Sequence, residues 1–182
     1  NSIFMNEKTQ RERTYIIAEI GINHEGSVDR CAEMIMSFAK AGANGVKLQS
    51  VDADRSYAEG TESYKLFSSA CLTQAETENM FQLSRQCGVE IFTTSGDLHT
   101  LEWVEKLGPA AHKISSGLLS CLPIVDATCN LKRPVLMSTG LSDINSIDDA
   151  MRIAEKRRCQ TAIFQCTSKY PCPPSELNLA AI

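Results

Sequence analysis

Residues 15–49 read YIIAEIGINHEGSVDRCAEMIMSFAKAGANGVKLQ. The first six and the last five residues of this stretch are short apolar runs typical of β-strands, and apolar residues three and four apart over 28–41 predict a one-sided helix. Gly42 follows the helix, and glycine accepts the left-handed backbone conformation that ends helices. Because parallel strands need a crossover of a dozen or more residues, this order of strand, helix and strand predicts a parallel sheet covered by helices.

The same strand and helix unit recurs along the chain. Apolar runs rich in β-formers predict six strands, at residues 15–20, 45–49, 90–94, 112–115, 134–138 and 161–166. Apolar residues three and four apart predict five helices, at residues 28–41, 74–87, 98–107, 122–129 and 144–158. The long polar interruption at residues 51–73 is predicted to be an extended loop that could fold over a site.

The spacing of the strands favours a barrel. Successive strands begin about 29 residues apart, and eight such units need roughly 230 residues, the usual size of a (β/α)8 barrel. A doubly wound open sheet would carry GxGxxG after its first strand, whereas residues 21–26 read GINHEG. We therefore predict an α/β fold, a (β/α)8 TIM barrel of which this chain carries about six βα units. Residues 1–14 form a polar N-terminal segment, and residues 15–182 form the incomplete barrel domain.

Composition excludes several classes of function. The chain has 182 residues, of which 43% are hydrophobic, and its formal net charge is −4, with no basic run that could bind nucleic acid. No apolar stretch approaches the roughly 18–20 residues that span a membrane. Eight cysteines occur without a CxxC pair or a signal-peptide pattern, so we predict reduced, mostly buried thiols in a cytoplasmic protein.

Polar residues follow every predicted strand at its carboxyl end, where barrels place their active sites. Glu19 and Lys47 are the most informative, because an unpaired charge inside an apolar run costs several kcal/mol. Two lysines and a row of hydroxyls at one mouth predict an anion site for a small acid or a phosphate, built from Lys47, Lys113, Thr94, Ser116 and Ser138. A lysine in this position can also form a Schiff base, so an aldolase-like lyase using Lys113 is a second hypothesis.

Five ordered motifs carry a resemblance to a known family: AEIGINHEGS (18–27), VKLQ (46–49), HKISSG (112–117), MSTG (137–140) and CTSKYP (166–171). In these motifs the chain resembles the sialic acid synthase family, enzymes that condense phosphoenolpyruvate to make N-acetylneuraminate and related nonulosonic acids. The resemblance implies a transferase that joins phosphoenolpyruvate to an N-acylated amino sugar such as N-acetylmannosamine and releases phosphate. It also implies a divalent metal, typically Mn²⁺, and a homodimer of the full-length protein.

The resemblance also implies a role for each candidate residue. Glu19 would orient or deprotonate the attacking water, and Lys113 would be a charge clamp rather than a nucleophile. Phosphoenolpyruvate would be held by Lys47, Thr94, Lys113, Ser116 and Ser138. The sugar would be contacted by Gln49, Ser168 and Tyr170.

The chain departs from the family pattern at several positions. Leu118 stands where an acidic residue is usual, Gly96 and Asp97 replace a Pro-Phe pair, and Ser168 replaces an asparagine. The family's two metal histidines belong to motifs expected beyond Ile182, as does its C-terminal antifreeze-like domain. We therefore predict no metal ligand in this chain and little activity for the chain alone. His24 is expected to order its loop rather than to bind metal.

A third hypothesis is a non-catalytic protein that binds an anion or a sugar. It would bind phosphoenolpyruvate without turnover, whereas a Schiff-base lyase would trap a carbonyl substrate on Lys113 with borohydride.

Overall fold

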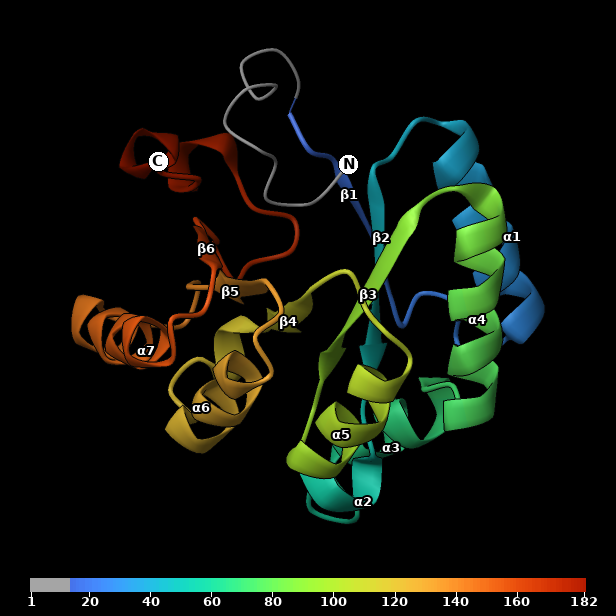
Figure 1. The fold of residues 1–182 in the computed structure, drawn as a ribbon, viewed down its shortest axis with the longest axis horizontal. Coiled ribbons are helices and arrows are strands. Elements are labelled where there is room, and N and C mark those ends of the chain that lie inside the picture. Colours follow the sequence, from blue (N-terminus) through green and yellow to red (C-terminus); the bar gives the residue numbers. More distant parts are fainter. Residues whose placement is uncertain (1–13) are drawn as a thin grey trace. The chain divides into compact units, whose positions relative to one another are not determined.

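A computed structural model describes residues 14–182, so of the predicted polar segment 1–14 only Thr14 falls among the described residues. The chain forms two compact units, one extending to Ala111 and the other spanning His112–Ile182. Each unit contains three of the six strands and is described by itself (Figure 1). Among residues 14–182, no helix combines the length and the apolar character that crossing a membrane requires.

The first unit is built on three parallel strands. They are β1 (Ile17–Gly21), β2 (Gly45–Ser50) and β3 (Glu90–Ser95), and β2 pairs with both of the others. Lys47 in β2 lies opposite Glu19 in β1 and Phe92 in β3. Because side chains alternate along a strand, this register sets which residues of the three strands share a face.

Three long helices belong to this unit: α1 (Val28–Lys40), α4 (Gln74–Cys87) and α5 (Leu98–Lys106). Each begins at a residue whose side chain accepts a hydrogen bond from the first turn, and these N-caps are Ser27, Thr73 and Asp97. Figure 1 shows α1 and α4 side by side along the strands. Their apolar faces pack on the sheet in a core that includes Cys31, Ile35, Val46, Phe81 and Ile91.

The prediction of an extended loop at residues 51–73 is wrong, because this segment contains two helices. Helix α2 (Ala53–Ser56) begins after Asp52, whose side chain accepts from the N–H of Asp54, and α3 (Glu62–Ala70) begins after Thr61 in the same way. The ring of Tyr57 stacks on that of Phe67 with 5.0 Å between centroids. Helix α2 has only four residues, too few to show a periodic pattern, and its packing against α3 stabilises a helix that propensity alone would not.

The ring of Tyr15 occupies the space beside Gly45, near the start of β2. The hydroxyl of Tyr15 donates to Oε2 of Glu90 at 2.5 Å. A Cβ added at Gly45 would lie 2.7 Å from that hydroxyl oxygen and 3.2 Å from Cε1 of Phe92. Glycine at position 45 is therefore required by packing, because the tyrosine occupies the volume that any larger residue would need.

The second unit is also a parallel three-stranded sheet. Its strands are β4 (His112–Ile114), β5 (Val135–Ser138) and β6 (Thr161–Phe164), with β5 between the other two. Its helices are α6 (Leu122–Asn130) and α7 (Ile144–Arg157), and short 3-10 turns cover Ser116–Leu118, Pro174–Glu176 and Leu179–Ala181. The carboxylate of Asp126 in α6 accepts two hydrogen bonds from the Arg157 guanidinium in α7, at 2.8 and 2.6 Å.

The six predicted strands and five predicted long helices are all confirmed, with bounds that differ by a few residues. All eight cysteines are free thiols, as predicted, although only Cys31 and Cys129 are fully buried and Cys121 is exposed.

Candidate functional site

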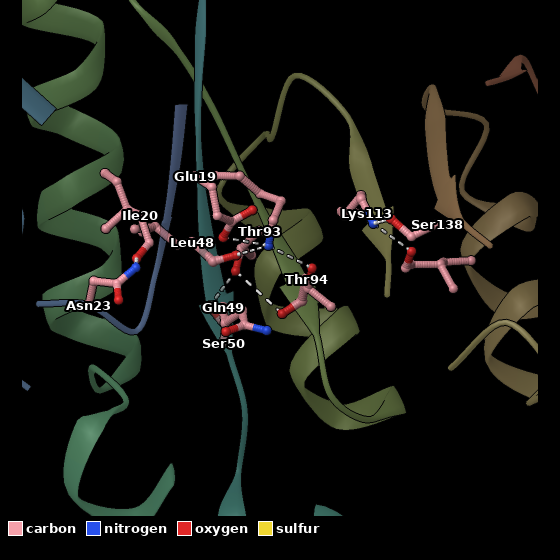
Figure 2. Close-up of polar contacts among 12 residues, drawn as sticks. Glu19, Ile20, Asn23, Leu48, Gln49, Ser50, Thr93, Thr94, Lys113 and Ser138 are labelled. Atoms are coloured by element: carbon pink, nitrogen blue, oxygen red, sulfur yellow. Dashed lines mark hydrogen bonds and ion pairs between the residues drawn. The ribbon is translucent and has the colours of Figure 1, made fainter. Parts of the chain in front are cut away.

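The first cluster of predicted site residues lies in the first unit, around the ammonium group of Lys47. Its Nζ is 3.1 Å from Oε1 of Glu19, and it donates to Oγ1 of Thr94 at 3.1 Å and to the backbone oxygen of Leu48 at 3.2 Å. Figure 2 shows these contacts as dashed lines beside Glu19 and Thr94. The three side chains come from β1, β2 and β3, so the parallel register brings together residues distant in the sequence.

The Lys47 cluster is electrostatically asymmetric. The lysine side chain is 8% exposed, whereas the side chain of Glu19 is 54% exposed. Burial lowers the pKa of Lys47 from the usual lysine value, and the nearby Glu19 carboxylate acts in the opposite direction. The result is a largely desolvated cation beside a solvent-exposed carboxylate, an arrangement that suits an anionic ligand entering from the solvent side.

Gln49, a predicted sugar contact, lies two residues after Lys47 on the same strand. Residues i and i+2 of a strand point to the same face, so the amide of Gln49 shares the face of Lys47. The position where a Cβ would stand on Gly21 is 3.4 Å from Oε1 of Gln49 and 3.0 Å from Oε1 of Glu19, which brings both side chains beside the end of β1.

The second cluster lies in the second unit, around Lys113 of β4. Its Nζ donates to Oγ of Ser138 at 2.5 Å and to the backbone oxygen of Ile114 at 2.8 Å (Figure 2). The same nitrogen lies 5.8 Å from the centroid of the Phe164 ring, within the range of a cation–π contact. Sequence reasoning missed Phe164, which the register of β5 against β6 places opposite Ser138.

Ser116 and Ser168 meet at Gly140, also in the second unit. The backbone N–H of Gly140 donates to Oγ of Ser116 at 3.1 Å. A Cβ at position 140 would lie 2.6 Å from Oγ of Ser168, 3.1 Å from Oγ of Ser116 and 3.2 Å from Cβ of Cys166. Gly140 is therefore a site residue that the predictions did not include, although it belongs to the quoted motif MSTG. Its signal would have been a glycine directly after a strand end.

The structure thus brings the predicted residues together in two sets, one in each unit. In the first, Lys47 contacts both Glu19 and Thr94, and in the second, Lys113 contacts Ser138. Tyr170, the other predicted sugar contact, is 96% exposed. Its role stays a prediction.

The histidine, cysteine and acidic side chains of the described residues do not gather into a metal site. Among residues 14–182 they form no group of three or more that could hold one. His24 is buried, and its Nδ1 accepts from the N–H of Gly26 at 3.2 Å, which is the loop-ordering contact predicted for it. Burial also lowers the pKa of His24. The Mn²⁺ that the resemblance implies stays a prediction.

Comparison with known proteins gives consistent matches. The chain is 33% identical to the spore coat polysaccharide biosynthesis protein SpsE of Bacillus subtilis over 92% of its own length and 48% of that protein. It is 28% identical to the N,N'-diacetyllegionaminic acid synthase of Campylobacter jejuni, over 94% of the chain and 56% of that enzyme. The chain therefore spans about half the length of these curated relatives.

A solved structure gives the same result. The N-acetylneuraminic acid (sialic acid) synthetase of Leptospira borgpetersenii, crystallised with citrate, superposes with a TM-score of 0.89 at 27% identity, over 92% of this chain and 59% of that one. The predicted fold class, α/β and part of a (β/α)8 barrel, is confirmed. The NeuB family profile matches residues 34–182. The chain belongs to the NeuB family, whose members include the sialic acid synthases, as the motifs predicted.

Proposed function

We propose that the chain forms part of an enzyme that condenses phosphoenolpyruvate with an N-acylated amino sugar to give a sialic acid or a related nonulosonic acid. The observation that carries the proposal is the repeated arrangement of a lysine ammonium and a strand-end hydroxyl, Lys47 with Thr94 and Lys113 with Ser138. Phosphoenolpyruvate carries a phosphate and a carboxylate, and ammonium and hydroxyl groups are the donors that such anions need.

In the proposed reaction, C3 of phosphoenolpyruvate forms a bond to the aldehyde carbon of the open-chain sugar, whose oxygen takes a proton from solvent. Positive charge develops at C2, and water adds there. Collapse of this adduct breaks the bond between C2 and the phosphate oxygen, which yields the keto acid and inorganic phosphate. The chain's own contribution is to hold the anionic groups, with Lys47 and Lys113 as fixed charges and Thr94, Ser116 and Ser138 as neutral donors.

Glu19 is the proposed acceptor of the water proton. Its side chain is more than half exposed, so water can reach it, and its contact with Lys47 fixes the carboxylate beside the proposed anion site. Gln49, Ser168 and Tyr170 are the proposed contacts of the sugar. A homodimer, a cytoplasmic location and a requirement for Mn²⁺, which would polarise the sugar aldehyde, stay predictions.

Calorimetric titration with phosphoenolpyruvate tests the proposal directly. We expect saturable binding that is lost in Lys47→Met and in Lys113→Met but kept in Lys65→Met, which removes a surface lysine paired with Glu62. Phosphate release and product mass are then measured with N-acetylmannosamine and Mn²⁺ present. A chain that does not bind phosphoenolpyruvate would contradict the proposal.

The same preparation separates the two other hypotheses. A Schiff-base lyase would leave a reduced adduct on Lys113 after incubation with pyruvate and borohydride, which peptide mass spectrometry detects. Binding of phosphoenolpyruvate with no phosphate release under any sugar and metal condition, in a protein that also carries the family's two metal histidines, would favour a binding protein instead.

A further inference from the structure

Strand β1 contains an irregularity directly after the proposed proton acceptor. Glu19 lies opposite Lys47 in β2, but the next paired residue of β1 is Gly21, which lies opposite Leu48. Ile20 is therefore an extra residue in the strand, and its side chain is buried in the core of the first unit. A bulge of this kind changes the direction in which the following residue points.

Position 21 faces the site. Gly21 has a φ of +55°, and a Cβ built on it would lie 3.0 Å from Oε1 of Glu19 and 3.4 Å from Oε1 of Gln49. In a regular strand Ile20 would pair with Leu48, whereas the bulge sets Gly21 opposite Leu48. Two constraints thus meet at one residue, a left-handed backbone and a lack of room for a side chain.

We propose that Gly21 is a positioning residue: its missing side chain leaves free the volume in which the Glu19 carboxylate can pair with Lys47. This inference rests on the role of Glu19 and Lys47 in the proposed function. The first atom that a side chain at position 21 would meet is the carboxylate oxygen of Glu19. That oxygen is the free end of a flexible side chain, so the least costly response is for Glu19 to move away from Lys47.

Moving Glu19 would alter the charge environment of Lys47. Among residues 14–182, the groups in contact with its ammonium are the Glu19 carboxylate from β1, the Thr94 hydroxyl from β3 and the backbone oxygen of Leu48, and of these Glu19 is charged. Burial already disfavours the protonated lysine, and Glu19 opposes this effect. Displacement of the carboxylate therefore lowers the pKa of Lys47, which a change confined to the stability of the fold would not do.

The experiment measures the pKa of Lys47 in the chain by NMR with lysine labelled at Cε, in the wild type, Gly21→Ala, Gly21→Asn and Glu19→Gln. Asparagine is chosen because it tolerates the left-handed conformation better than most residues and has a larger side chain. We expect the pKa of Lys47 to fall slightly in G21A and, in G21N, to fall to the value found in E19Q.

The matched control is Gly88→Asn. Gly88 has a φ of +68°, and a Cβ there meets nothing within 4 Å, so G88N carries the backbone cost without the contact. We expect G88N to lower the melting temperature about as much as G21N and to leave the pKa of Lys47 unchanged. A wild-type pKa of Lys47 in folded G21N would overturn the inference, and so would an equal fall in G88N.

Titration with phosphoenolpyruvate at a series of pH values distinguishes this inference from the proposed function. If the wild type binds, the loss of binding at high pH should begin at lower pH in G21N and in E19Q than in the wild type or in G88N. If the wild type does not bind, the proposed function fails. The comparison of Lys47 pKa values still decides whether Gly21 positions Glu19. Should G21N not fold, G21A decides the question by the direction of its shift relative to Gly88→Ala.

Discussion

Glu19 and Lys47 form an ion pair across two neighbouring strands. The side chain of Lys47 is shielded from water, with 8% of its surface exposed, whereas that of Glu19 is 54% exposed. Removing the lysine ammonium from water costs free energy. Its attraction to a carboxylate that is still half-solvated offsets only part of this cost. The pair is therefore better explained by a requirement for a cation at this position than by its contribution to the stability of the fold.

Replacement of Lys47 by methionine should separate binding from stability. Methionine fills a similar volume without a charge, and the Glu19 left behind is open to water, so the free energy of unfolding should rise by about 1 kcal/mol. Affinity for phosphoenolpyruvate should fall by about a hundredfold, because a charge-assisted contact is lost. Urea denaturation and calorimetry measure the two effects. The surface variant Lys65→Met should change neither, and a K47M variant that is strongly destabilised would show that the ion pair supports the fold.

The lowered pKa of Lys47 predicts opposite effects of pH on binding and on stability. As the pH rises toward the ordinary lysine pKa of 10.5, the folded chain loses the Lys47 proton before the unfolded chain does. Binding of an anion should therefore weaken at a lower pH than an ordinary lysine would predict. Over the same range, the contribution of Lys47 to the free energy of unfolding should rise, because the unfolded chain holds more protons.

The difference in unfolding free energy between the wild type and K47M isolates this contribution from other titrating groups. A difference that stays constant from neutral pH to pH 10.5 would mean that the pKa of Lys47 is not lowered by burial.

Gly140→Ala should displace the hydroxyls of Ser116 and Ser168 without removing either of them. The added methyl group would lie 2.6 Å from Oγ of Ser168 and 3.1 Å from Oγ of Ser116, so both hydroxyls must move. We expect affinity for phosphoenolpyruvate to fall about tenfold, which corresponds to about 1.4 kcal/mol. Gly117→Ala is the control, because a Cβ there meets nothing within 4 Å. Equal losses in the two variants would show that the crowding at Gly140 does not matter for binding.

The thiols should differ widely in their rates of alkylation. Cys121 is exposed, whereas burial raises the pKa of Cys31 to about 11 and that of Cys129, which neighbours Cys159, to about 12. Because the thiolate is the reactive form, iodoacetamide should modify Cys121 first, with Cys31 and Cys129 last. Peptide mass spectrometry over time follows the reaction, and all eight cysteines should react in denaturant. A disulfide-linked peptide would contradict the prediction of free thiols.

The sequence was enough to predict those candidate site residues whose placement follows from their position along a strand. Lys47, Thr94 and Lys113 all lie within strands, and alternation along the strands is enough to predict the face on which each lies. Sequence reasoning did not find Phe164 beside Lys113 or the crowding at Gly140, because these depend on the register of β5 against β6 and on the path of the chain after β5. Register is set by tertiary packing, which the local pattern records only weakly.

The helices α2 and α3 were missed for a different reason. Each begins at a capping side chain, Asp52 or Thr61, that is equally typical of a turn. The bulge at Ile20 was missed because YIIAEIG is apolar at nearly every position, and a uniformly apolar run does not reveal a break in alternation.

Tyr15 contacts Glu90 across the space left by Gly45, so the residues allowed at these three positions depend on one another. A relative with a side chain at position 45 must give up the tyrosine, and the glutamate then loses the hydroxyl that donates to it. Substitutions at 15, 45 and 90 should therefore occur together or not at all, although the three residues are separated along the chain by whole helices.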